Sequence, residues 1–66
     1  MISVNGRNLQ LDAEVLAELL ATLGYAPTQA GIAVAVNGAV VPRDRWAAHA
    51  LRAGDAVEIV GAVQGG

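Results

Sequence analysis

Two Asn-Gly pairs, at residues 5–6 and 37–38, constrain the fold of this chain more than any other feature. The first pair lies between two short runs in which apolar and polar residues alternate. The second pair follows a run in which isoleucine or valine alternates with alanine. Asn-Gly in that setting is a strong signal for a β-hairpin, because a two-residue type I′ turn needs positive φ at both positions. The sequence therefore predicts two hairpins, one at the start of the chain and one just after its midpoint.

The strands follow from the same alternation. A two-residue turn at 5–6 places Ile2 opposite Leu9. Residues 32–36 alternate valine or isoleucine with alanine, which predicts a half-buried strand, and residues 39–41 form a brief strand that Pro42 ends. Residues 43–49 are predicted to form a short helix or a single turn. Residues 56–60 form the last strand, with Val57 and Ile59 pointing inward.

One amphipathic helix is predicted between the hairpins. Its apolar stripe follows the i, i+3, i+4, i+7 spacing at Leu16, Leu19, Leu20 and Leu23. Asp12 is a suitable N-cap residue, and Glu14 would lie near the positive end of the helix dipole. Gly24 stands where a C′ glycine ends a helix. We therefore expect the helix to begin after Asp12 and to end before Gly24.

A helix with one leucine stripe and a sheet must cover each other, because neither can bury its apolar face alone. The order of elements requires a crossover connection, and such crossovers are almost always right-handed. The sequence predicts an α+β fold, with a mixed sheet of four to five strands and one main helix packed across it. Residues 1–60 would form the domain, and residues 61–66 a flexible C-terminal tail.

Composition excludes several classes of protein. The 66 residues include no cysteine, so neither a disulfide nor a thiolate zinc site is expected. The net charge is −2 and the four basic residues form no stripe, so nucleic acid is not an expected partner. No apolar run reaches the roughly 20 residues that span a bilayer. Without a signal peptide pattern, the expected location is the cytoplasm.

No catalytic constellation is visible. The single histidine, His49, has no orienting partner in the sequence, and no glycine-rich phosphate loop opens a helix. Asp44, Asp55 and Glu58 do not have the spacing of a metal-binding loop. We therefore expect no catalytic residue, no metal site and no bound cofactor, and the chain is not expected to be an enzyme.

The C-terminal Gly65-Gly66 is the strongest functional candidate. Residues 61–66 would reach roughly 20 Å if extended, at about 3.3 Å per residue. Glycines let a narrow tunnel close around their backbone, so the terminal carboxylate could enter the cleft of another protein. A carboxylate needs activation, for example as an acyl-adenylate made by an ATP-using partner, before it accepts sulfur or another nucleophile. The alternative is an inert, frayed end.

The C-terminal half resembles one known family. It contains Val-Pro-Arg-Asp-Arg-Trp-Ala-Ala-His at residues 41–49, then Leu51, the pair at 54–55, Val-Glu-Ile at 57–59 and the closing Val63-Gln64-Gly65-Gly66. This pattern is similar to the ThiS family, the sulfur carriers of thiamine biosynthesis. The likeness covers residues 32–66, and the N-terminal half agrees in the order and length of its elements.

The resemblance implies a ubiquitin-like β-grasp fold and a mechanism. A ubiquitin-activating-like adenylyltransferase would adenylate the Gly66 carboxylate with ATP. Sulfur from a cysteine desulfurase persulfide would then convert it into a thiocarboxylate, and thiazole synthase would receive that sulfur. Val63, Gln64 and Gly65 would be recognised with the tail.

Four further residues are candidates for docking on a partner. Ala33 and Ala35 alternate with inward-pointing residues, so they would lie on the sheet face away from the helix, where small apolar side chains permit close contact. Trp46 is either a lid over one edge of the core or an anchor in a partner pocket. Arg43 is either solvated or docked on an acidic partner surface.

Three other functions remain open at this point. The small subunit of a molybdopterin synthase uses the same thiocarboxylate chemistry on the same fold, although the Pro-Arg-x-x-Trp run at residues 42–46 argues against it. A ubiquitin-like modifier would be joined to target lysines through Gly66. A plain interaction module would have an inert tail.

Overall fold

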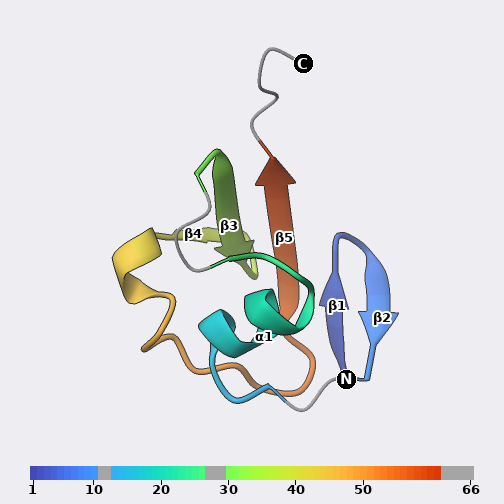
Figure 1. Ribbon diagram of the computed structural model, residues 1–66. Helices are drawn as coiled ribbons and strands as arrows, with labels where there is room; N and C mark the ends of the chain where they lie inside the picture. The colour runs from blue at the N-terminus through green and yellow to red at the C-terminus, as the bar shows by residue number, and fades with distance from the viewer. Residues whose placement is uncertain (11–12, 27–29, 62–66) are drawn as a thin grey trace.

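The computed structural model describes residues 1–10, 13–26 and 30–61. One five-stranded sheet carries a single α-helix across one face within these ranges (Figure 1). The elements are β1 Ile2–Val4, β2 Arg7–Leu9, α1 Leu16–Thr22, β3 Ile32–Val36, β4 Ala39–Val41, the 3₁₀ helix η1 Arg43–Arg45 and β5 Ala56–Gly61. The predicted α+β fold with a mixed sheet and one main helix is confirmed.

Both predicted turns are present. Asn5 and Gly6 have φ angles of 52° and 83°, and Asn37 and Gly38 have φ angles of 53° and 85°. These are the positive values that a type I′ turn requires at both central positions. Each turn joins two antiparallel strands, β1 to β2 and β3 to β4.

Strand β5 lies in the middle of the sheet, whose order is β2-β1-β5-β3-β4. It pairs in parallel with β1 and antiparallel with β3. Ile2 pairs with Leu9, as the two-residue turn predicted. Gly61 pairs with Ile32 and is the last residue of β5, so the strand continues one residue further than predicted. The assignment of Gly61 to the tail was wrong, because β3 is long enough to pair with it.

The helix begins later than the sequence predicted. Its N-cap residue is Val15, which is extended (φ −132°, ψ 160°) and makes no side-chain capping bond. Asp12 lies outside the described residues, and the prediction that the helix starts directly after it was wrong. Glu18, and not Glu14, is the acidic residue of the first turn, and its Oε1 accepts a hydrogen bond of 2.8 Å from the Glu14 N–H.

Backbone from another part of the chain satisfies the first turn of α1. The Leu16 N–H donates to the carbonyl of His49 at 2.9 Å, and the Ala17 N–H donates to the carbonyl of Trp46 at 3.0 Å. Val15 forms a β-bridge with Ala50, which keeps it extended. The N–H groups that a side-chain cap normally satisfies are therefore bonded by residues 46–49.

The helix ends as predicted. Gly24 has a φ of 97°, and its N–H donates to the carbonyl of Ala21 at 3.0 Å. The Tyr25 N–H donates to the carbonyl of Leu20 at 2.9 Å. These two bonds form a Schellman motif, which places a positive φ at the residue after the C-cap.

The core lies between α1 and the inner face of the sheet. Leu16 and Leu19 are fully buried, and Leu20 is nearly so. The inward positions of β5 are buried as predicted. The buried cluster consists of Ile2, Val4, Leu16, Leu19, Leu20, Val34, Val36, Val41, Trp46, Val57 and Ile59.

Leu19→Ala should destabilise the protein severely. Leu19 is 0% exposed, and truncating a buried leucine costs about 2–5 kcal/mol. That is a large share of the free energy of unfolding of a domain this small. Leu23 is only partly buried, so Leu23→Ala is the matched control with a smaller loss. Urea unfolding followed by circular dichroism measures both, and equal losses for the two variants would show that the stripe is wrongly placed.

Candidate functional site

The sheet face away from α1 carries an apolar patch. We define the outer-face patch as Ala33, Ala35, Val40 and Val60. Val40 and Val60 are 73% and 64% exposed, which is unusual for valines in a sheet. They lie on this face because the buried valines and isoleucines of the same strands occupy the alternate positions.

Strand register brings the four residues together. Val60 is the cross-strand partner of Ala33, and Val40 is the partner of Ala35. Directly paired side chains on one face lie about 4.5–5.5 Å apart at their Cβ atoms. Glu58, the other partner of Ala35, gives this face one carboxylate. Val40 and Val60 were not candidates in the sequence, since only the register of three strands shows that they adjoin the alanines.

The patch adjoins the end of β5. Val60 is followed by Gly61, the last described residue before the tail. Val63, Gln64, Gly65 and Gly66 lie outside the described residues. The outer-face patch and the tail candidates are thus linked through the last two residues of β5.

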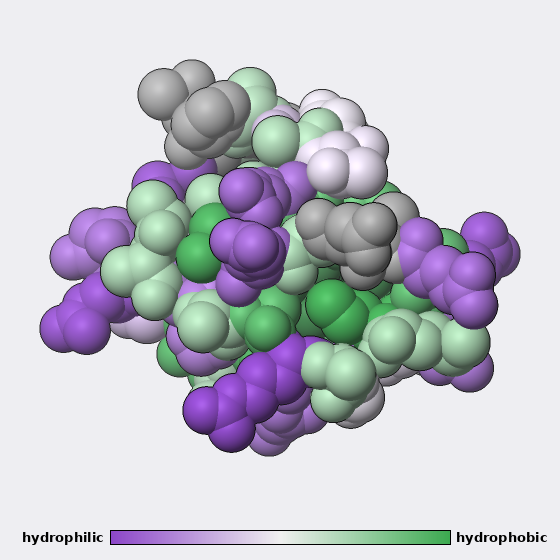
Figure 2. Space-filling model, turned by 90° about the horizontal axis from the view of Figure 1, so that it is seen from below, coloured by the Kyte–Doolittle hydropathy of each residue, from purple (hydrophilic) through white to green (hydrophobic). Residues whose placement is uncertain are grey.

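The lower end of the molecule in Figure 1 lies opposite the end at which β5 finishes, and it carries both hydrophobic and hydrophilic residues. Figure 2 shows it from below, with a few strongly hydrophobic residues in the middle and hydrophilic residues on both flanks. The large exposed apolar side chains of the described strands are Val40 and Val60, both in the outer-face patch.

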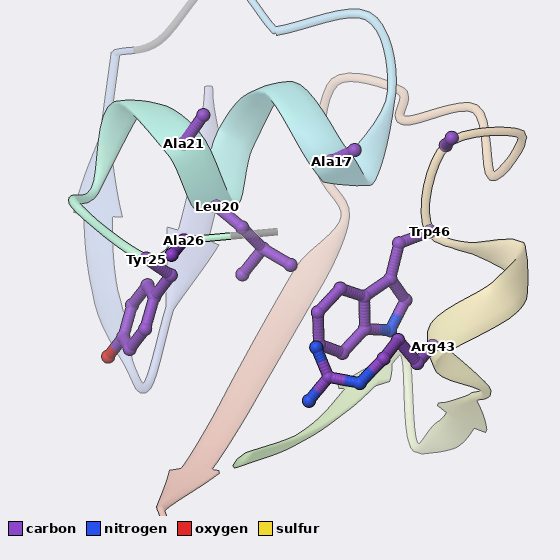
Figure 3. Close-up of a pocket in the computed structure, with 8 residues that line it drawn as sticks. Ala17, Leu20, Ala21, Tyr25, Ala26, Arg43 and Trp46 are labelled. Atoms are coloured by element: carbon purple, nitrogen blue, oxygen red, sulfur yellow. The ribbon is translucent and has the colours of Figure 1, made fainter. Parts of the chain in front are cut away.

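Trp46 belongs to the core. It is 5% exposed, and its indole N–H donates to the carbonyl of Val41 at 2.9 Å. The structure supports the interpretation of Trp46 as a lid and leaves almost no indole surface for anchoring in a partner pocket. Arg43 lies over the indole, with its guanidinium carbon 4.5 Å from the ring centroid (Figure 3). This is the geometry of a cation–π contact.

A small hollow separates this pair from the helix. It has a volume of about 130 Å³, and the side chains of Leu20 and Tyr25 face Trp46 across it (Figure 3). Most of its lining is apolar, and Tyr25 and Arg43 supply its polar side-chain groups. The lining residues are Ala17, Leu20, Ala21, Tyr25, Ala26, Arg43, Trp46 and Ala47.

Within residues 1–10, 13–26 and 30–61, no three His, Cys, Asp or Glu side chains gather to hold a metal ion. No helix in the same ranges is long and apolar enough to cross a membrane. The features with evident functional potential are the outer-face patch and the strand end that leads to residues 62–66.

The sequence model of the ThiS family matches residues 2–66. The chain belongs to the ThiS family. The sulfur carrier protein ThiS of Escherichia coli (strain K12) is 42% identical to this chain over 38 residues. That segment spans 58% of each protein.

Two solved structures support the same assignment. The crystal structure of the thiamine biosynthesis protein ThiS from Geobacter metallireducens matches with a TM-score of 0.80 and 35% identity, over 98% of this chain and 97% of that one. A solution NMR structure of a thiamine biosynthesis protein from the same organism matches with a TM-score of 0.77 and 32% identity, over 98% and 86%. The ThiS-family chain thus has the expected ubiquitin-like β-grasp fold.

Asp55 organises the turn that precedes β5 in the ThiS-family chain. Its Oδ2 accepts a hydrogen bond of 2.8 Å from the Arg52 N–H, and its Oδ1 accepts one of 3.0 Å from Asn37 Nδ2. The Arg52 backbone bond, followed by the Asn37 bond, lowers the pKa of Asp55 below its usual value. The sequence indicated only a turn at 54–55, because the partner Asn37 is distant along the chain.

Lowering the pH should therefore weaken the fold through Asp55. Its folded pKa lies below the unfolded value of about 3.9, so its stabilisation is complete above that pH and disappears as the pH falls through the folded pKa. Asp55→Asn should lower the melting temperature at pH 7 and flatten its decline below about pH 4. Asp44→Asn, which removes a carboxylate from η1, is the control of equal charge. The role given to Asp55 would be contradicted if the melting temperature of Asp55→Asn declined below about pH 4 as steeply as that of the wild type.

Proposed function

We propose that this chain is a sulfur carrier of thiamine biosynthesis, a cosubstrate of other enzymes and not itself a catalyst. The match to the ThiS family over residues 2–66, which extends to Gly65-Gly66, carries this proposal. The E. coli relative is named as a sulfur carrier protein. The described residues supply a packed core and an exposed apolar patch on the sheet, which suit a carrier that docks on an enzyme.

The proposed reaction takes place on the Gly66 carboxylate. A carboxylate oxygen attacks the α-phosphorus of ATP on a ubiquitin-activating-like adenylyltransferase, and pyrophosphate leaves. The terminal sulfur of a persulfide from the cysteine desulfurase system then attacks the acyl carbon, and AMP leaves. Attack of a thiol on the persulfide-derived sulfur farther from the acyl group then forms a disulfide with that sulfur and releases a thiocarboxylate on Gly66. Thiazole synthase is the proposed acceptor of this sulfur.

The chain's own contribution would be to dock on its partner and to bring the C-terminal tail to the partner's active site. The outer-face patch would dock on the adenylyltransferase, because contiguous exposed apolar surface often marks a binding site. Val60 belongs to this patch and lies in the strand that leads to the tail, so docking would also set the starting point of the tail. Gly65 would let the enzyme close around the backbone, with Val63 and Gln64 recognised beside it. ATP would be bound by the partner and not by this chain.

The tail gives the sharpest test. Removing Gly66 draws the carboxylate back by about 3.3 Å, and adding a residue buries the original carboxylate in a peptide bond. Displacements of about 1 Å at a reacting centre can cost a hundredfold in rate. Both variants, and Gly65→Val with its β-branched side chain, should fail in ATP–pyrophosphate exchange with the adenylyltransferase and should acquire no sulfur. Their melting temperatures should equal that of the wild type, which serves as the control for folding.

Intact mass of the protein from cells distinguishes the proposal from its alternatives. A carrier shows oxygen replaced by sulfur, a protein modifier shows conjugates of higher mass, and an inert module shows neither. The proposal is wrong if the protein without Gly66 still exchanges pyrophosphate and acquires sulfur at the wild-type rate. A molybdopterin synthase subunit would instead donate its sulfur when molybdopterin synthase, and not thiazole synthase, is supplied.

A single glutamate should disrupt docking. Ala33→Glu places a charge on the outer-face patch opposite Val60, and its affinity for the adenylyltransferase should fall at least about tenfold by the desolvation of that charge. Ala35 is a poorer site for this test, because Glu58 lies opposite it and like charges in that arrangement destabilise a sheet. Ala21→Glu changes an exposed alanine on α1, across the sheet, and is the matched control. Calorimetric titration that gave equal affinities for both variants would rule out the outer-face patch.

A further inference from the structure

The asparagine side chains of both turns bind strand β5. Asn5 Nδ2 donates to the carbonyl of Ile59 at 3.2 Å, and its Oδ1 accepts from the Ile59 N–H at 2.7 Å. Asn37 Oδ1 accepts from the Ala56 N–H at 2.9 Å. One turn therefore holds β5 near its end, and the other holds β5 at its start.

We call the two bonds between Asn5 and Ile59 the Asn5 clamp. They take the place of the backbone bonds that a longer β1 would make with β5. The ladder between β1 and β5 ends with Val4 opposite Val57, and the Asn5 N–H donates to the carbonyl of Val57 at 2.8 Å. The chain then turns away at Asn5, so no β1 backbone lies beside Ile59. The primary amide supplies one donor and one acceptor, as a peptide group does, and thereby satisfies both backbone groups of Ile59.

The clamp acts on the part of β5 that leads to the tail. On its other edge, β5 pairs with β3 as far as Gly61. With the Asn5 clamp, β5 is held along both edges at the level of Ile59, two residues before the strand ends. Releasing one edge would let the last residues of β5 twist or shift, which would change the direction in which the chain leaves the sheet after Gly61.

We propose that Asn5 is a positioning residue for the reacting C-terminal carboxylate, acting through Ile59 and the end of β5. This inference rests on the proposed carrier function. Asn5 would not touch the adenylate. It would fix the direction in which the chain leaves the sheet while the outer-face patch is docked, and misplacement by about 1 Å is enough to slow the chemistry a hundredfold.

The chain contains its own control for this proposal. Asn5→Gly and Asn37→Gly each replace Asn-Gly by Gly-Gly, which also favours a type I′ turn. Both variants keep the backbone bonds that their turns make, from residue 5 to Val57 and from residue 37 to Ala56. Both gain the same freedom in the unfolded chain. They differ in which end of β5 loses side-chain hydrogen bonds. Asn5→Gly loses both bonds to Ile59, whereas Asn37→Gly loses the bond from the Ala56 N–H and the bond to Asp55.

The experiment has one structural and one kinetic readout. Amide exchange by NMR should be about tenfold faster at Ile59 in Asn5→Gly and at Ala56 in Asn37→Gly, since each loses about one hydrogen bond's worth of protection. In ATP–pyrophosphate exchange with the adenylyltransferase, Asn5→Gly should lower kcat by about tenfold or more at an unchanged KM, because the docking patch is intact. Asn37→Gly should leave both constants at the wild-type value. Asn5→Asp keeps the acceptor for the Ile59 N–H but places a carboxylate oxygen against the Ile59 carbonyl, so its kcat should also fall below the wild-type value.

Each outcome is decisive. Equal kcat values for Asn5→Gly, Asn37→Gly and wild type overturn the positioning role while leaving the carrier function in place. Equal losses of kcat in the two glycine variants, in step with their melting temperatures, show a purely structural effect and also overturn it. A wild-type chain that supports no exchange at all overturns the proposed function, and the positioning role falls with it.

Discussion

Hydrogen bonding along both edges of β5 is the constraint on which the rest of the structure depends. One edge is bonded by β1 and then by the Asn5 side chain, and the other by β3 and, at its start, by Asn37. The first hairpin and the second hairpin do not pair with each other, so β5 is what joins them into one sheet. The inner face that covers α1 exists only because β5 lies in the middle. The outer-face patch has the same origin, since Val60 of β5 adjoins alanines of β3.

The attachment of the helix shows a second long-range dependence. A helix of seven residues has little stability of its own, and α1 begins without a side-chain cap. Carbonyl groups of residues 46 and 49 take the place of that cap, and the indole of Trp46 is fixed in turn by the carbonyl of Val41. The segment between β4 and β5 therefore serves as both lid and cap. Trp46 is thus the residue of the Pro-Arg-x-x-Trp run that supports the helix, while residues 42–45 are exposed.

Features set by neighbouring residues could be predicted from the sequence, and features set by topology could not. The turns, the pairing of Ile2 with Leu9 and the end of α1 at Gly24 follow from local φ requirements and a period of two or 3.6 residues. The start of α1 could not be predicted in this way, because the carbonyl groups that cap it come from about thirty residues further along the chain. The outer face of β3 was predicted at Ala33 and Ala35, whereas Val40 and Val60 needed the strand register. The asparagines were recognised as turn formers, but which strand their side chains bind depends on the sheet order.

The cap on α1 also bears on how the chain folds. The first N–H groups of the helix reach their acceptors only after the loop from residue 16 to residue 49 has closed. The chain therefore loses the entropy of loop closure before these hydrogen bonds can stabilise the helix. The sheet also depends on a late segment, because its central strand, β5, is the last of the strands in the described part of the chain. The two hairpins can pair locally, but the cap of α1 and the strand that joins the hairpins into one sheet both come from residues beyond 45. During synthesis the first forty residues would leave the ribosome without a stable partner, and folding would follow as one cooperative, two-state event when β5 emerges.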